Sequence, residues 1–274
     1  MQTINCKGKL IDFSIPRVMG ILNITPDSFF DGDVYTNHNE ILNHTEKMLN
    51  EGARFIDVGA YSSRPNAVHI SEDKELLRIV PIIELLIKEF PEIIISVDTF
   101  RSNVAKKTCN AGAAIINDIS GGKMDKKMFK TIAELQVPYI LMHMLGTPQT
   151  MQENPNYKNV TTELISFFAE QLFNLRQLQV HDVIIDVGFG FGKTVKHNFE
   201  LLKNLTLFKN LDAPILAGIS RKSMLYNPLK ISPNEALNAT TSANTIALLH
   251  GANILRVHDV KEAMESIKIV EQLT

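Results

Sequence analysis

Short apolar runs alternate along the chain with longer segments in which apolar residues recur every three or four positions. A run rich in β-branched residues is typical of a strand buried on both faces, and the longer spacing is typical of an amphipathic helix. The pattern predicts eight strands, at 18–24, 54–60, 93–98, 113–118, 138–143, 182–188, 213–219 and 253–258. It predicts a helix after each strand, at 39–51, 72–89, 101–111, 125–136, 158–179, 196–209, 232–250 and 261–272.

Eight strand–helix pairs form either an open doubly wound sheet or a closed barrel of parallel strands. The even spacing and the length of 274 residues favour a closed α/β fold, the (β/α)8 TIM barrel, for which about 250 residues are typical. No low-complexity linker or change in composition divides the chain, so a single domain is predicted over residues 1–274. Residues 1–17 predict a short N-terminal hairpin, expected to close the bottom of the barrel formed by 18–274.

Composition excludes several classes of partner. The 28 basic and 30 acidic residues nearly balance, so no field of the whole molecule attracts nucleic acid or a membrane surface. Cys6 and Cys109 lie far apart without metal-type spacing, and we expect them to be reduced, as in cytoplasmic proteins. The start of the chain lacks a secretory signal, and no apolar run approaches the roughly 20 residues of a membrane span. We therefore expect a cytoplasmic protein with small-molecule ligands.

Polar residues stand where each predicted strand ends: Asn23, Asp57, Asp98, Asn117, Asp118, His143, Asp186, Ser220 and His258. In a barrel these ends meet at the carboxyl-terminal mouth, where barrel enzymes hold their active sites. Asn and Asp also punctuate turns and cap helices, an alternative that suits Asp57 and Asp118 best. It does not easily account for polar residues at all eight ends, so an active site at the mouth is predicted.

Asp98, Asn117 and Asp186, at the ends of the third, fourth and sixth strands, are candidate acceptors for a ligand. Buried carboxylates are costly unless they receive hydrogen bonds. A ligand with adjacent N–H groups, such as an aminopyrimidine edge, would provide those bonds in bidentate fashion.

Two groups of cations point to an anionic or electron-rich ligand. Ser220 is expected to cap a helix whose first turn holds Arg221 and Lys222, where cations oppose the helix dipole unless such a ligand lies in front. Arg256 and His258 lie two positions apart on a strand, so they point the same way, and phosphate oxygens suit the fork of an arginine. Solvated surface cations and a structural salt bridge are the alternatives.

The glycine-rich segment 186–194 approaches the pattern of a phosphate-binding loop but fails by one residue, because Val187 stands where the first glycine is required. We expect its glycines to allow close approach to a ligand, with Phe191 as an apolar wall. The segments 24–37 and 60–71 are expected to be mobile loops over the mouth, since loops of this length are usually functional. Ordinary surface turns are the alternative.

Eight motifs, in this order, resemble those of the dihydropteroate synthases. They are MGILNITPDSFFDG, SSRP, SVDTFR, INDISGG, LMHM, DVGFGFGKT, GISRKSM and RVHDV, and the resemblance covers residues 18–265. Each motif is weak alone, but eight in the right order at the ends of successive strands are very specific. The resemblance implies a TIM-barrel transferase of folate biosynthesis that condenses 6-hydroxymethyl-7,8-dihydropterin diphosphate with 4-aminobenzoate, giving 7,8-dihydropteroate and pyrophosphate. It also implies a target for sulfonamides.

The resemblance assigns roles by motif position. It implies pterin contacts from Asp98, Asn117, Met142, Asp186 and Lys222. It implies diphosphate contacts from Asn23, Ser63, Arg256 and His258, with Mg²⁺ bound at the amide oxygen of Asn23. It implies an aminobenzoate pocket formed by Phe29, Ser63, Arg64, Pro65, Phe191 and Ser223. Asp31, Arg64 and Lys222 would be catalytic. The diphosphate would leave first, in a dissociative step, and the arylamine would then attack the cationic pterin methylene. Asp31 would cover this methylene before the attack.

Two other functions stay open. A methyltransferase barrel that uses a reduced folate would share the pterin acceptors but would have no use for Arg64, Arg256 and His258 as a second site. A non-catalytic pterin-binding paralogue is allowed by residues 60–66, which read AYSSRPN where the family has GESTRPG. The family is often dimeric; the apolar segment 243–254 is a candidate dimer surface, which the core of the barrel explains equally well.

Overall fold

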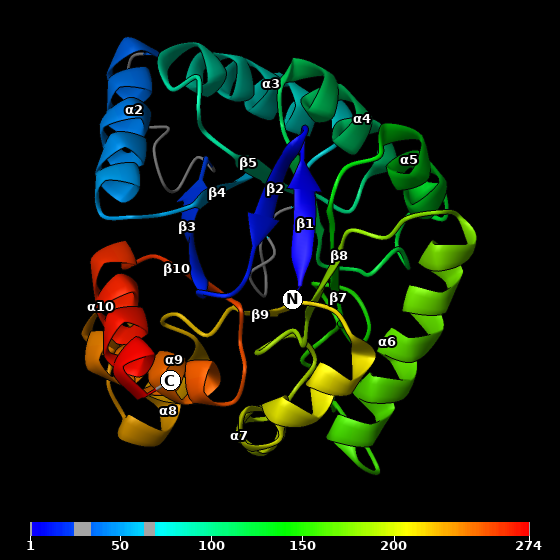
Figure 1. The fold of residues 1–274 in the computed structure, drawn as a ribbon, viewed down its shortest axis with the longest axis vertical. Coiled ribbons are helices and arrows are strands. Elements are labelled where there is room, and N and C mark those ends of the chain that lie inside the picture. Colours follow the sequence, from blue (N-terminus) through cyan, green and yellow to red (C-terminus); the bar gives the residue numbers. More distant parts are fainter. Residues whose placement is uncertain (1, 25–33, 63–68, 274) are drawn as a thin grey trace.

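A computed structural model of the chain describes residues 2–24, 34–62 and 69–273. Eight parallel strands close into a barrel, as the sequence predicts (Figure 1). In chain order they are β3 (Arg17–Asn23), β4 (Phe55–Gly59), β5 (Ile95–Asp98), β6 (Ile115–Asp118), β7 (Tyr139–Met142), β8 (Val183–Asp186), β9 (Ile215–Ala217) and β10 (Ile254–Val257). Pairing of β10 with both β9 and β3 completes the ring.

The helices form the outer layer around the strands (Figure 1). They are α2 (Val34–Asn50), α3 (Glu72–Glu89), α4 (Ser102–Ala111), α5 (Met128–Leu135), α6 (Val160–Gln177), α7 (Val195–Lys203), α8 (Ser223–Leu229), α9 (Leu237–Leu249) and α10 (Val260–Val270). Within the described ranges, 3-10 turns lie at Leu205–Leu211, Pro233–Glu235 and Glu271–Leu273.

Two predicted helices are wrong in their extent. The expected helix 196–209 ends at Lys203, and the chain continues as a 3-10 turn. The expected helix 232–250 begins with a 3-10 turn, because Ser232 and Pro233 form a capped start of their own before α9. The helix expected directly after Ser220 is present as α8, but it begins only at Ser223 and has only seven residues, with Pro228 inside it.

An antiparallel hairpin, β1 (Thr3–Cys6) and β2 (Lys9–Asp12), precedes the barrel. Lys7 and Gly8 both have positive φ, 51° and 83°, which is the backbone of the tight turn that suits the twist of two paired strands. The buried residues Ile4, Ile11 and Phe13 belong to one cluster with the first inward-facing residues of the barrel strands. The hairpin therefore covers the amino-terminal end of the barrel, as expected, and the opposite end is left for a site.

Strand alternation decides what lines the mouth. The inward-facing layer near the hairpin is apolar and consists of Met19, Phe55, Ile115, Ile140, Ile184, Leu216 and Ile254. Two positions further along each strand, the side chain points inward again. This second layer contains Asp57, Asn117, Met142, Asp186, Gly218 and Arg256. The intervening residues, such as Ile56 and Leu255, pack outward against the helices. A filled core therefore lies directly beneath a polar mouth.

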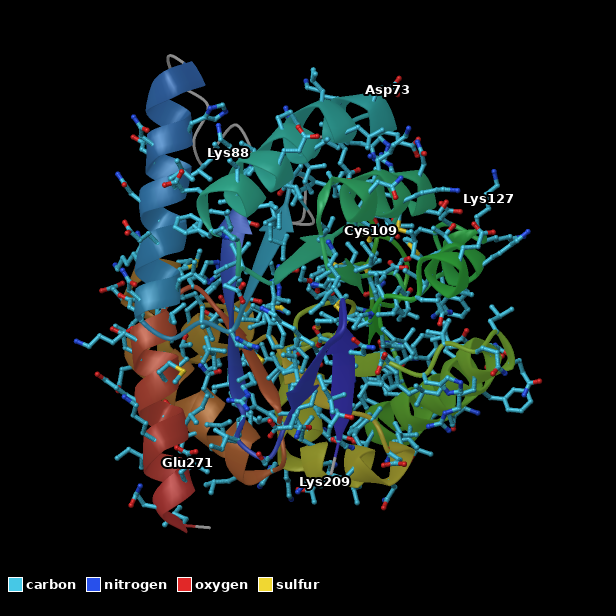
Figure 2. All side chains as sticks on the ribbon, turned by 45° about the horizontal axis from the view of Figure 1, so that its top comes forward. Asp73, Lys88, Cys109, Lys127, Lys209 and Glu271 are labelled. Carbon is cyan, nitrogen blue, oxygen red and sulfur yellow. The ribbon has the colours of Figure 1, made fainter. Side chains whose placement is uncertain are left out.

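The outer surface of the helices is charged. Figure 2 shows Asp73, Lys127, Lys209 and Glu271 at the periphery of the molecule, away from the strands. In the candidate dimer segment 243–254, Ala247 and Leu248 are buried in the barrel, whereas Ile246 and Leu249 are exposed. The core thus accounts for part of this segment, and two apolar side chains remain at the surface. None of the helices in the described ranges has the length and apolar character needed to cross a membrane.

A buried ion pair ties α3 to the start of α4. Arg101 contacts the fully buried Glu75, and the Thr99 hydroxyl donates to the same carboxylate at 2.7 Å. The Arg101 guanidinium also donates to the carbonyl of Ile70 at 2.6 Å. Burial raises the pKa of Glu75, against the opposing effects of Thr99 and Arg101. The pair therefore holds the described end of the connection between β4 and α3.

Removing one partner of this pair is expected to destabilise the fold strongly. Glu75→Ala leaves the guanidinium buried without its carboxylate, at a cost of about 3–5 kcal/mol in the free energy of unfolding. Lys106 and Glu134 form an exposed pair between α4 and α5, so Lys106→Ala is the control and should change stability by less than about 1 kcal/mol. Equilibrium urea denaturation measures both, and equal effects of the two substitutions would contradict the assignment.

Candidate active site

Arg256 lies at the centre of the mouth between two carboxylates. Its Nε donates to Asp57 Oδ2 at 2.6 Å, and its Nη2 donates to Asp98 Oδ2 at 3.2 Å. Burial would lower the pKa of Arg256, but the two carboxylates raise it above its usual value. Burial raises the pKa of Asp98 to about 7, although Arg256 opposes that shift. The arginine is therefore a fixed cation, and Asp98 titrates near neutrality.

Asp57 takes part in the mouth, so its interpretation as a turn residue was wrong. It is fully buried, and the same Oδ2 that accepts from Arg256 also accepts from Asn117 Nδ2 at 3.0 Å. The turn interpretation holds for Asp118, whose carboxylate accepts from the backbone N–H groups of Ser120 and Gly122 at 2.7 and 2.9 Å. The difference follows from direction, because Asp57 faces into the barrel and Asp118 faces outward.

Asp186 and Lys222 form the opposite wall of the mouth. The N–H of Gly188 donates to Asp186 Oδ1 at 2.8 Å, and Lys222 Nζ donates to the carbonyl of Phe189 at 2.5 Å. Lys222 Nζ also lies 4.7 Å from the centre of the Phe191 ring. Burial lowers the pKa of Lys222 to about 8, opposed by Asp186. Burial raises the pKa of Asp186, opposed by Lys222.

Gly218, on the segment after β9, leaves space between these groups. A Cβ built there would lie 3.8 Å from both Asp186 Oδ2 and Lys222 Nζ, and 3.9 Å from Arg256 Cβ. Three of the predicted ligand-binding side chains therefore surround one point of the mouth. An acceptor, a donor and a guanidinium at this point suit a flat heteroaromatic ring with polar edges.

The expected cap at Ser220 is wrong. Helix α8 begins at Ser223 with Lys222 as its N-cap, and Ser220 instead contacts His258 Nδ1 at 3.0 Å. Arg221 has a positive φ of 53° and turns away from Lys222, pairing with both oxygens of Asp259 at 2.8 and 2.9 Å. Arg221 is therefore a structural residue, while Lys222 alone points into the mouth.

The glycine-rich segment 188–192 packs closely on the end of β7. Gly188 has a φ of 68°, and a Cβ there would lie only 2.1 Å from the carbonyl oxygen of His143. The buried Lys193 closes the segment, since its Nζ donates to the carbonyls of His143 and Phe191 at 3.2 and 2.9 Å. Burial lowers the pKa of Lys193 to about 7. The glycines allow a rigid platform beneath Lys222, and no pattern in the sequence predicted the part that Lys193 plays in it.

Asn23 ends β3 on the side of the mouth nearest Asp98. A Cβ built on Gly59, between the two, would lie 3.6 Å from Asn23 Oδ1 and 3.7 Å from Asp98 Oδ2. Two oxygen atoms thus border one small space. Within residues 2–24, 34–62 and 69–273, no cluster of three or more His, Cys, Asp or Glu could hold a metal ion. This donor set fits Mg²⁺, which is usually bound by one or two protein oxygens together with substrate phosphates and water.

The remaining predicted residues fall into two groups. Met142 is buried beside Gly188, Phe191 is half-buried under Lys222, Ser223 is half-buried at the start of α8, and His258 is exposed beyond β10. Phe29, Asp31, Ser63, Arg64 and Pro65 lie outside the described residues, as do the segments 25–33 and 63–68 of the two predicted mobile loops.

Tyr61, at the start of the second of these loops, is buried, with its ring edge-on to Phe100 at 5.1 Å. Its hydroxyl receives a hydrogen bond from Gln149 Nε2 at 3.0 Å, which links the connection after β4 to the connection after β7. The polar residues around Tyr61 in the sequence give no sign of this burial, because its aromatic partner comes from the next strand–helix unit.

Comparisons with known proteins agree with this geometry. Residues 19–258 match the family described as pterin binding enzyme. The dihydropteroate synthase of Escherichia coli strain K12 is 42% identical over 267 residues, which cover 97% of this chain and 94% of that protein. A solved structure of the Yersinia pestis dihydropteroate synthase, with a sulfonamide drug complex, has a TM-score of 0.93 and 39% identity, covering 99% of each chain. The Xanthomonas albilineans enzyme, solved with 4-aminobenzoic acid, has a TM-score of 0.91 and 34% identity, covering 99% of this chain and 97% of that one.

A methyl group added at Gly218 is expected to block the ligand without harming the fold. Its contacts in the free protein are ordinary, but it projects among Asp186, Lys222 and Arg256. Gly218→Ala should weaken binding of 6-hydroxymethylpterin by about 1–3 kcal/mol, which is about 5- to 150-fold. Isothermal titration calorimetry measures the affinity and thermal unfolding measures the stability. Gly188→Ala is the contrast, because its clash with His143 should lower the melting temperature; unchanged pterin binding by Gly218→Ala would contradict the location of the site.

Proposed function

The chain belongs to the dihydropteroate synthases of the pterin binding enzyme family, and on that premise we propose how its residues carry out their reaction. These transferases of folate biosynthesis join 6-hydroxymethyl-7,8-dihydropterin diphosphate to 4-aminobenzoate, releasing pyrophosphate and 7,8-dihydropteroate. The observation that carries the residue-level proposal is the convergence of Asp186, Lys222 and Arg256 around Gly218.

The pterin lies in the space in front of Gly218, against Met142. Its aminopyrimidine N–H groups donate to Asp186 and Asn117, and Asp98 accepts from the other side of the ring. Lys222 donates to an electron-rich atom of the same ring. This assignment is supported by the burial of the three acceptors, because buried carboxylates and amides need hydrogen-bond partners. A ligand without those N–H groups would leave the acceptors unpaired, so the site would reject it.

Arg256, His258, Asn23 and Ser63 hold the diphosphate. A guanidinium has five N–H donors, and the bonds to Asp57 and Asp98 use two of them, so others remain for phosphate oxygens. The Arg256 cation, together with His258, stabilises the negative charge that develops on the leaving group as the C–O bond breaks. Bound Mg²⁺, held by the amide oxygen of Asn23 together with the diphosphate, would add Lewis-acid stabilisation of the same charge.

The pterin methylene becomes cationic when the diphosphate leaves, and the neutral amine of 4-aminobenzoate attacks it. Asp31 shields the cation, and Arg64, Ser63, Pro65, Phe29, Phe191 and Ser223 hold the aminobenzoate. The position of Phe191 beneath Lys222 supports this arrangement, because it lets one residue face both substrates. No covalent enzyme intermediate is required.

The alternatives receive less support. A methyltransferase would have no use for a diphosphate site, and the relatives that match nearly the full chain are synthases. The non-catalytic paralogue is separated from the synthase by the first experiment below. A homodimer and a cytoplasmic location stay predictions, consistent with the exposed Ile246 and Leu249 and with the free cysteines Cys6 and Cys109.

The purified protein should release pyrophosphate from the dihydropterin diphosphate and Mg²⁺ only when 4-aminobenzoate is present. Lys222→Ala should lower kcat/KM by about 100-fold or more, since it removes a charged donor from the site. Arg64→Ala should raise the KM for aminobenzoate while leaving pterin binding intact. Coupled pyrophosphate detection provides the rates. Pterin binding by calorimetry without any turnover would instead favour the non-catalytic paralogue.

The activity should fall as the pH rises past the titration of Lys222. Its pKa is lowered to about 8 by burial, with Asp186 and Asp98 raising it and Arg256 lowering it, so the cation is present below that pH and lost above it. We expect kcat/KM for the dihydropterin diphosphate to decline above about pH 8, approaching tenfold per pH unit. Lys222→Arg keeps its charge and should show a lower rate without this decline. A decline that persists in Lys222→Arg would assign it to another group.

A further inference from the structure

Asp57 links three strands across the mouth, although none of the assigned substrate contacts includes it. It lies on β4, whose neighbours are β3 and β5. Its two hydrogen-bond partners lie on the strands beyond these neighbours: Arg256 is on β10, next to β3, and Asn117 is on β6, next to β5. The carboxylate therefore reaches across the barrel instead of along its wall.

A single oxygen of Asp57 receives both bonds. Oδ2 accepts from Arg256 Nε at 2.6 Å and from Asn117 Nδ2 at 3.0 Å. The side chain is fully buried, and Oδ1 has no hydrogen-bond partner among the described residues. Such a buried carboxylate is costly unless it is paired, so its presence calls for a role that an apolar residue could not fill.

The consequence for Asn117 is a fixed amide orientation. The two ends of an amide have nearly the same shape, but only the NH₂ end can donate to a carboxylate. Reversing Asn117 would place its oxygen against Asp57 Oδ2. The carboxylate therefore directs Asn117 Oδ1 away from itself, and that oxygen is buried without a partner among the described residues. An unpaired acceptor in a ligand site requires an N–H group from the ligand.

The consequence for Arg256 is a fixed guanidinium plane. Nε is held by Asp57 and Nη2 by Asp98, so the arginine has two anchors from two different strands. Only 17% of its side chain is exposed. Its remaining donors therefore emerge in a set direction at the rim of the mouth.

We propose that Asp57 is a positioning residue that sets pterin specificity by presenting Asn117 Oδ1 as an acceptor to the substrate and by aiming Arg256. This rests on the proposed pterin site. The ligand group that Asn117 selects is an N–H donor on the aminopyrimidine edge, and an analogue with an oxygen acceptor at that place is rejected. Asp57 does not touch the reacting atoms.

The test compares two ligands that differ in this group, 6-hydroxymethyl-7,8-dihydropterin and 6-hydroxymethyl-7,8-dihydrolumazine, in which the 2-amino donor is replaced by a carbonyl acceptor. Calorimetry measures both affinities for the full-length protein and its variants. The wild type should prefer the dihydropterin. Asp57→Ala frees the Asn117 amide to reverse, so the preference should shrink by about tenfold or more. Asp57→Asn can still offer an oxygen to both donors, so it should keep the preference within about threefold.

Asp118→Ala is the matched control, because Asp118 is equally buried on β6 but faces outward. It should lose stability and keep the wild-type preference. Should Asp57→Ala not fold, Asp57→Ser replaces it; a hydroxyl both donates and accepts, so it does not select one end of the amide, and the same loss of preference is expected.

The possible outcomes test the pterin site and the role of Asp57 separately. A wild type that binds neither pteridine overturns the proposed pterin site. A wild type that prefers the dihydropterin, together with Asp57→Ala or Asp57→Ser that prefers it equally, overturns the role of Asp57. Equal losses of preference in the Asp57 and Asp118 variants also overturn it, because they would reduce Asp57 to a general contribution to stability.

Discussion

Charge balance inside the barrel mouth is the constraint on which the site depends. Three carboxyl groups, of Asp57, Asp98 and Asp186, share this water-poor space with two cationic side chains, Arg256 and Lys222. Burying an unpaired charge is costly. Arg256 forms ion pairs with both Asp57 and Asp98, and the positive charge of Lys222 stabilises the carboxylate of Asp186. Burial raises the pKa of Asp98 to about 7, although Arg256 opposes the shift and Asp57 adds to it. A neutral ring rich in N–H groups relieves the cost of this burial by donating hydrogen bonds, without adding a charge that would have to be buried in turn.

Rigidity of the surrounding framework keeps this arrangement in place. The apolar layer of Phe55, Ile115 and Ile254 fills the barrel directly below the polar layer, so the acceptors cannot sink into the core. On the other wall, Gly188 brings the backbone against His143, and Lys193 fastens the segment by donating to the carbonyls of His143 and Phe191. The side chains proposed to bind the pterin thus lie on strands or on a segment that packs against the strands. Geometry held in this way discriminates between ligands without a large rearrangement on binding.

Much of the fold was predictable because the strands are buried on both faces and the helices are amphipathic, two patterns that are visible in the order of residues. The start of the helix α8 was predicted wrongly, because its seven residues are too few to show a periodicity and they include Pro228. Ser220 and Arg221 were misassigned because the chain adopts a positive φ at Arg221, a residue type that gives no warning of that conformation. Lys193 was missed because its acceptors are backbone carbonyls, which every residue possesses. The burial of Tyr61 could not be predicted because it depends on Phe100, from the next strand–helix unit.

Asp57 and Asp118 show how the direction of a side chain decides the role of a polar strand end. Its polar identity at a strand end fits both a turn residue and an active-site residue, and so does that of Asp118. The two differ in parity relative to the strand core: Asp57 lies two positions after the inward-facing Phe55, whereas Asp118 lies three positions after the inward-facing Ile115. Because side chains alternate strictly along a strand, the first must enter the mouth and the second must face the helices. Counting from the apolar interior layer that the structure identifies therefore separates polar strand ends that build a site from those that only hold a turn.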